Sequence, residues 1–261
     1  LLAVIGIGAM FYNLEAAVSN FEFVLSFASI IFVVIVPILT MRAMAEERRQ
    51  RTDQLLYSLP ITTTQVVLGK YFALLVVHLI PLAVVSLYPL LFSQFGEVYL
   101  PTSYGSLFAF FMMGAALLAV GMFLSSLTDN QGFAAGIGVA AILLNYYSVS
   151  LAEDTSSTAM GSLIALYVIA LLLGVVIRGL TRNENLAYGV TLVLIAALSV
   201  AYFVNSSAFE GLLPDIMTKL SLFRQFNSFV NGAFDLTAIV YYVSVMGFFL
   251  FLSVQSMEKR R

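Results

Sequence analysis

The sequence has no cysteine and no tryptophan, and it contains a single histidine and little charge. Only 10% of its 261 residues are charged, whereas soluble domains carry about 25%. The absence of cysteine excludes disulfide bonds, thiolate metal sites and a cysteine nucleophile. The net charge of -2 argues against nucleic acid as a partner, because binding to phosphates needs a clustered basic surface.

Hydrophobic residues are abundant instead, at 61% of the chain with a mean hydropathy of +0.99. A membrane-spanning helix needs about 20 apolar residues. Leu1–Tyr12 is typical of the end of such a span, and because the chain begins at Leu1 we expect this span to be cut short. The other apolar runs are Phe21–Thr40, Val66–Phe92, Ser106–Leu127, Phe133–Leu151, Met160–Leu180, Leu186–Val204 and Leu236–Val254. We therefore predict an all-α polytopic membrane protein with about eight transmembrane helices in a single domain, residues 1–261.

The basic residues indicate how these spans are oriented. Eight spans place every Lys and Arg on one side of the membrane, except Lys219 and Arg224. Cytoplasmic loops carry an excess of Lys and Arg, so this side is predicted to be cytoplasmic and both termini with it.

Residues 41–65 form a long connection on the predicted cytoplasmic side. Helix-forming residues and the pair Glu47–Arg51, spaced i,i+4, predict a charged helix that ends at Pro60. Thr62 and Gln65 fit a capping box at the start of the next span. A partner docked on this charged helix could push on the spans at both of its ends, which we favour over a merely solvated charge run.

Residues 205–235 form the second long connection, on the predicted outer side. Five apolar residues recur in it at helical spacing, and they predict an amphipathic helix lying on the outer leaflet. These residues are Leu213, Ile216, Met217, Leu220 and Phe223.

The chain lacks a nucleotide-hydrolysing motif. Gly69-Lys70 is followed by Tyr71 and has no earlier glycine at the spacing of a phosphate-binding loop, so we expect no ATPase on this chain. Within the spans His78 is the one ionisable candidate, either as a proton relay or ligand contact, or as a neutral imidazole hydrogen-bonded to a neighbouring helix. A histidine without a carboxylate partner favours the second interpretation. Asn145 and Tyr146 either contact a substrate or lie in the interfacial aromatic belt.

Two segments far apart in the chain carry a family resemblance. The first contains Glu46–Arg49, then Leu55–Pro60, then Gly69-Lys70 entering a span. The second runs Phe226–Leu236, followed by Tyr241-Tyr242 and a basic C-terminal end. Together they resemble the ABC type-2 exporter permeases, and most closely their GldF-like branch.

The resemblance implies a permease subunit in the plasma membrane of a bacterium, paired with a second permease domain as a homodimer or heterodimer. A separate nucleotide-binding ATPase subunit would hold ATP and Mg²⁺, with no cofactor on this chain, and an accessory membrane protein is a further implied partner. Ala45–Leu59 would be the main coupling helix, and the link Ser125–Gln131 a secondary contact. The implied docking residues are Glu46, Glu47, Arg48, Arg49, Arg51 and Asp53, with Thr128, Asp129 and Asn130 in the secondary contact.

The resemblance also has a point of departure, because many type-2 permeases have six spans. The additional pair lies near Met160–Val204. Two other functions stay open from the residues alone: an ATP-independent secondary carrier or channel, and a membrane anchor or assembly factor. An apolar interior suits a hydrophobic or amphipathic substrate, such as a lipid, a lipid-linked precursor, a hydrophobic peptide or a drug.

Overall fold

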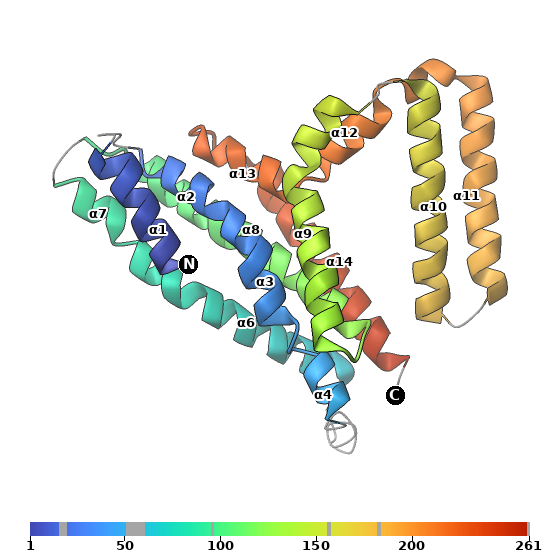
Figure 1. Ribbon diagram of the computed structural model, residues 1–261, viewed down its shortest axis with the longest axis horizontal. Helices are drawn as coiled ribbons and strands as arrows, with labels where there is room; N and C mark the ends of the chain where they lie inside the picture. Colours follow the sequence, from blue (N-terminus) through green and yellow to red (C-terminus); the bar gives the residue numbers. More distant parts are fainter. Residues whose placement is uncertain (16–19, 51–60, 95–96, 156–157, 182–183, 260–261) are drawn as a thin grey trace. The chain divides into compact units, whose positions relative to one another are not determined.

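The computed structural model describes the chain except residues 16–19, 51–60, 95–96, 156–157, 182–183 and 260–261. All regular elements in this described part are helices (Figure 1). Six continuous helical stretches, some of them made of several elements, are long and apolar enough to cross a membrane, judged by length and composition. Leu2–Asn13 and Ala159–Val175 are shorter apolar helical stretches. The prediction of an all-α polytopic membrane protein is confirmed.

The chain divides into two compact units, which we call unit 1 (Leu1–Tyr146 with Leu222–Arg261) and unit 2 (Tyr147–Ser221). The long helix α9 (Gln131–Asp154) begins in unit 1 and ends in unit 2. The other elements of unit 1 are α1 (Leu2–Ala9), the π-helix η1 (Met10–Glu15), α2 (Glu22–Ala28), the 3-10 helix η2 (Ser29–Ile31), α3 (Phe32–Thr40), α4 (Ala45–Arg49), α6 (Thr63–Val85), α7 (Tyr88–Phe92), α8 (Leu100–Ser126), α13 (Leu222–Val230) and α14 (Leu236–Glu258).

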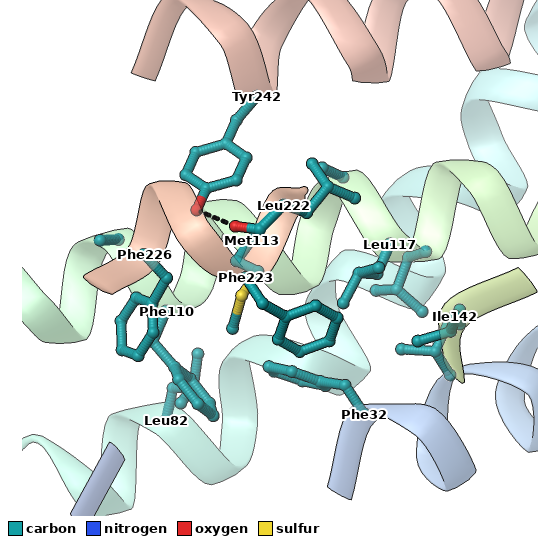
Figure 2. Packing of buried hydrophobic residues seen from close by; sticks show 14 of the residues in the cluster. Phe32, Leu82, Phe110, Met113, Leu117, Ile142, Leu222, Phe223, Phe226 and Tyr242 are labelled. Atoms are coloured by element: carbon teal, nitrogen blue, oxygen red, sulfur yellow. Dashed lines mark hydrogen bonds between the residues drawn. The ribbon is translucent and has the colours of Figure 1, made fainter. Parts of the chain in front are cut away.

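Helix α8 is the centre of unit 1, because α14, α13, α3 and α6 all pack against it. Phe110 of α8 lies between Phe32 and Phe226, with ring centroids 4.7 Å and 5.7 Å away. The Tyr242 hydroxyl of α14 is also buried in this cluster and donates a hydrogen bond of 2.9 Å to the Leu222 carbonyl (Figure 2). Aromatic side chains from four helical segments thus form one core.

Polar side chains join the helices of unit 1 at several depths. The Tyr71 hydroxyl donates to the Ala115 carbonyl at 3.0 Å and links α6 to α8. Ser103 of α8 donates to the buried Glu22 carboxylate of α2 at 2.8 Å. Such bonds are valuable between apolar helices, where lipid offers no alternative partner.

Helix α6 begins as its local sequence predicts. The predicted capping box is confirmed, since Gln65 N–H donates to Thr62 Oγ1 at 3.3 Å and Gln65 Oε1 accepts from Thr62 N–H at 3.0 Å. The run predicted as one span to Phe92 is interrupted after Val85, and α7 starts with Pro89 in its first turn. Proline fits a first turn because its missing N–H is not needed there.

Unit 2 is a helical hairpin followed by two short helices. Its helices α10 (Ala159–Thr181) and α11 (Glu184–Val204) pack along each other, and η3 (Ser206–Phe209) and α12 (Leu212–Lys219) pack on α10. Ser199 donates to the Ile195 carbonyl, so the 2.7 Å bond between Tyr167 and Ser199 across the hairpin has the tyrosine as donor. A Cβ on Gly174 would collide with Thr191, which shows how closely the two helices approach.

The segment before the last span forms two helices, α12 and α13, where the sequence predicted one. The predicted amphipathic residues Leu213, Ile216 and Met217 lie on α12, and Phe223 lies on α13. Four residues of α13 are buried in unit 1: Leu222, Phe223, Phe226 and Phe229. Because large apolar side chains at helical spacing find complementary partners on α8 and α2, α13 packs on the bundle. A position of α12 on the outer leaflet stays a prediction.

Candidate functional site

Helix α4 and the turn before it form a charged junction between α3 and α6. Met44 and Ala45 are buried, whereas Arg42, Arg49 and Gln50 are exposed. Glu46 accepts a hydrogen bond of 3.2 Å from the Gln50 side-chain amide. The short helix therefore rests on the bundle with its first residues and presents charged and amide groups outward. We call Met41–Arg49, Lys70 and Ser125 the α4 junction.

Ser125, in the last turn of α8, satisfies the backbone at the start of α4. Its Oγ accepts from Ala45 N–H at 3.2 Å and from Met44 N–H at 3.4 Å. The same hydroxyl donates to the Met41 carbonyl, at 3.2 Å, where α3 ends. Because the first N–H groups of a helix have no intrahelical partner, this side chain acts as a cap supplied by another helix.

Lys70, in the second turn of α6, holds the junction from its other side. Its ammonium donates to the Ala43 carbonyl at 2.8 Å and forms an ion pair with Glu47 of α4. Its side chain is 18% exposed and that of Glu47 is 33% exposed, so the pair is partly shielded from solvent. Glu47 thus pairs with Lys70, while its predicted partner Arg51, together with Asp53 and the Arg48 side chain, lies outside the described residues.

The predicted secondary contact, Thr128–Asn130, links α8 to α9 directly after Ser125. Asn130 Oδ1 accepts from Gly132 N–H at 2.9 Å and from Phe133 N–H at 3.3 Å, which caps the start of α9. Asp129 is exposed. The structure therefore brings this link to the same end of unit 1 as the α4 junction.

His78 lies in the interior of α6 and is 5% exposed. Its ring stacks on Phe111 with centroids 5.7 Å apart and meets the edge of Phe32 at 5.5 Å. Gly114 leaves room for the imidazole, since a Cβ there would collide with it. The imidazole is hydrogen-bonded to the Phe111 backbone of α8, in agreement with the interhelical bond that the sequence favoured. Its Nε2 atom has no hydrogen-bond partner among the described residues.

Asn145 and Tyr146 of α9 hold the start of α13. Asn145 Oδ1 accepts from Leu222 N–H at 3.0 Å, and the Tyr146 ring meets Phe223 edge-on with centroids 5.0 Å apart. These contacts belong to a different cluster from the rings around His78. A substrate-pathway role for the three residues stays a prediction.

Sequence reasoning missed the role of Ser125 and the burial of Glu22. The available signals were weak. Two serines, Ser125 and Ser126, close an otherwise apolar run, and Glu22 stands at the start of another. Neither pattern predicts which distant segment of the chain the side chain contacts.

The family model described as ABC-2 family transporter protein matches residues 9–152, which is more than half of the chain. The chain belongs to the ABC-2 transporter family. It is accordingly a multi-pass membrane protein and a permease subunit, and membership implies association with a nucleotide-binding ATPase subunit. No curated protein and no solved structure matches this chain.

The ABC-2 match covers the whole α4 junction and ends inside α9. Most of unit 2, including both helices of its hairpin, lies beyond it. Within the described residues, no group of three or more His, Cys, Asp or Glu side chains could hold a metal ion. An ATP-independent carrier is not favoured for a member of this family.

Proposed function

We propose that this chain is the permease subunit of an ATP-driven exporter and that α4 docks its nucleotide-binding subunit. The observation that carries the proposal is the α4 junction, a charged helix tied to both α6 and α8 inside the family-matched region. The exposed Arg49 and Gln50 offer polar groups to a protein partner. Because α4 is bonded to two spans, movement of a docked subunit would reach both of them.

The docking side is cytoplasmic in this proposal, as the positive-inside rule predicts for residues 41–65. Both termini lie on the same side, in the plasma membrane of a bacterium. ATP and Mg²⁺ bind the partner subunit there. Arg51 and Asp53 extend the docking surface, and Thr128–Asn130 supplies the secondary contact.

The substrate is a hydrophobic or amphipathic molecule that is moved outward. Two permease domains pair to form its path, with an accessory membrane protein as an additional partner. Assignment to the GldF-like branch rests on Glu46–Arg49, Leu55–Pro60 and the segment Phe226–Leu236.

Extraction of the chain from native membranes in mild detergent, followed by mass spectrometry of co-purifying proteins, tests the proposal. A stoichiometric nucleotide-binding subunit is the expected result. A chain that purifies alone in several detergents contradicts the proposal and favours an ATP-independent carrier.

Charge reversal separates docking from folding in the same assay. The double variant Arg48→Glu/Arg49→Glu is expected to remain in the membrane and to lose the ATPase subunit. Arg178→Glu is the matched control, because this exposed arginine lies on α10, away from α4 in the chain. Full retention of the ATPase subunit by the double variant counts against α4 as the docking helix.

A further inference from the structure

We infer that Ser125 and Lys70 are positioning residues that transmit movement of the docking helix to α8 and α6. The inference rests on the proposed function and adds to it the groups through which a docked ATPase moves the spans. It concerns only unit 1, where all members of the α4 junction lie.

Ser125 attaches the α4 junction to the last turn of α8. One buried hydroxyl bonds three backbone groups, on Met41, Met44 and Ala45, so it holds the end of α3 and the start of α4 together. Backbone hydrogen bonds leave no side-chain torsion on the α4 side of the contact. A displacement of the first turn of α4 therefore acts directly on the last turn of α8.

Lys70 ties the same short segment to α6 at two points. Its ammonium bonds the Ala43 carbonyl in the turn and pairs with Glu47 one turn later. Along the chain, these two contacts flank the bonds of Ser125 with Met44 and Ala45. Rotation of α4 about either contact alone is thereby opposed by the other.

Helix α8 can carry such a displacement through the unit. In its apolar stretch 72% of the residues are buried, the highest share among the candidate spans. Ser256 of α14 donates to the Ser126 carbonyl at 3.0 Å, so α14 is attached one residue from Ser125. Close-packed interiors shift as rigid elements and deform little, so movement at one end of α8 is expected to reach its other end.

A different result is expected if Ser125 and Lys70 have only a structural role. If their bonds only stabilise the fold, their loss should weaken ATPase docking and stability together. If they transmit movement, the ATPase subunit should still bind and hydrolyse ATP, while α8 no longer responds to nucleotide.

The test uses the complex of the full chain with its co-purified nucleotide-binding subunit. Because the chain has no cysteine, Tyr99→Cys introduces a unique thiol on this chain. Tyr99 is 73% exposed and immediately precedes α8, at the end remote from Ser125. The rate of labelling of this thiol by a fluorescent maleimide is measured without nucleotide and with ATP plus vanadate.

The rate is expected to depend on nucleotide in the parent complex, and Ser125→Ala and Lys70→Met should each lose most of this dependence. Both should keep the bound ATPase subunit and its ATP hydrolysis. Lys70→Arg should restore the response, since it keeps the cation beside Glu47. Ser253→Ala is the matched control, because this buried hydroxyl bonds the Phe249 carbonyl of its own helix.

Three results would overturn the inference. The labelling rate could depend on nucleotide in both variants as strongly as in the parent complex, or it could be independent of nucleotide in the parent complex itself. The variants could also lose the ATPase subunit together with the nucleotide dependence of labelling. A parent chain that binds no nucleotide-binding subunit is a separate outcome. It contradicts the proposed function itself.

Discussion

Unit 1 and unit 2 are both built from apolar helices, but their helices differ in how far they are buried against other parts of the protein. In the apolar stretch of α8 in unit 1, 72% of the residues are buried, whereas 6% of the residues are buried in that of α11 in unit 2. Fully buried side chains in unit 1 include Phe110 and Tyr242, while the buried residues of α10 and α11 include Ala170 and Ala187. Lipid can cover apolar helix surfaces at little cost, so extensive burial against protein marks the helices whose positions are fixed by their neighbours.

The difference follows the family relationship. The ABC-2 match covers most of unit 1 before α13 and stops before α10. Unit 2 contains the segment Met160–Val204, in which the sequence predicted an additional pair of spans. Among its described residues, the hairpin is held by close packing at Gly174 and by the hydrogen bond between Tyr167 and Ser199. We take unit 1 to be the docking and coupling unit, with unit 2 as an addition to it.

Truncation of one aromatic residue in each unit should give the largest contrast. Phe110→Ala removes a ring packed between Phe32 and Phe226, and it should lower the free energy of unfolding by about 3–5 kcal/mol through the cavity it leaves. Phe203, on α11, is 88% exposed, so Phe203→Ala should change it by no more than about 0.5 kcal/mol. Denaturant unfolding in detergent micelles measures both, and equal losses would contradict the comparison.

Removal of one carboxylate in each unit should give a smaller contrast. Glu22→Ala leaves the buried Ser103 hydroxyl without its acceptor and should cost about 1–3 kcal/mol. Glu184→Ala breaks an exposed ion pair with Arg178 and should cost about 0.5 kcal/mol or less. Thermal denaturation of the purified variants compares the two losses of stability. A larger loss for Glu184→Ala than for Glu22→Ala would contradict the prediction.

Loss of one tyrosine hydroxyl in each unit should give the smallest contrast. Tyr242→Phe removes a fully buried bond to the Leu222 carbonyl and should cost about 1.5 kcal/mol, near the upper end for bonds between membrane helices. Tyr167→Phe should cost about 0.6 kcal/mol, because Ser199 keeps its own bond to Ile195. A Tyr167 effect equal to that of Tyr242 would show that the hairpin is held as firmly as the core.

Local features of the fold were predictable from the sequence, and long-range pairings were not. The capping box of Thr62 and Gln65 depends on residues three positions apart, so their types suffice to predict it. Apolar runs predict spans because hydrocarbon thickness fixes helix length. The division of the outer segment into α12 and α13 depends on packing partners of Phe226 and Phe229 that lie elsewhere in the chain.

In the candidate site, too, local features were predictable from the sequence and long-range contacts were not. The charges Glu46–Arg49 were visible as a docking candidate because they interrupt an apolar chain. The bonds that hold them were not visible, since Ser125 is 80 residues from Ala45 and any serine could as well bond its own helix. Asn145 is another example. A polar residue in a span suggests a substrate contact, but in the structure Asn145 accepts a hydrogen bond from Leu222 N–H at the start of α13.

Excision of the hairpin tests the central claim, that unit 1 alone docks the ATPase subunit. Leu213 N–H lies 3.3 Å from Ser162 Oγ, so the segment begins and ends close together and a short Gly/Ser linker can replace residues 159–211. The measurement is the amount of nucleotide-binding subunit that co-purifies with this variant, as a monodisperse complex, relative to the full chain. We expect full retention; loss of the ATPase subunit from a variant that still inserts and elutes as one species would contradict the claim.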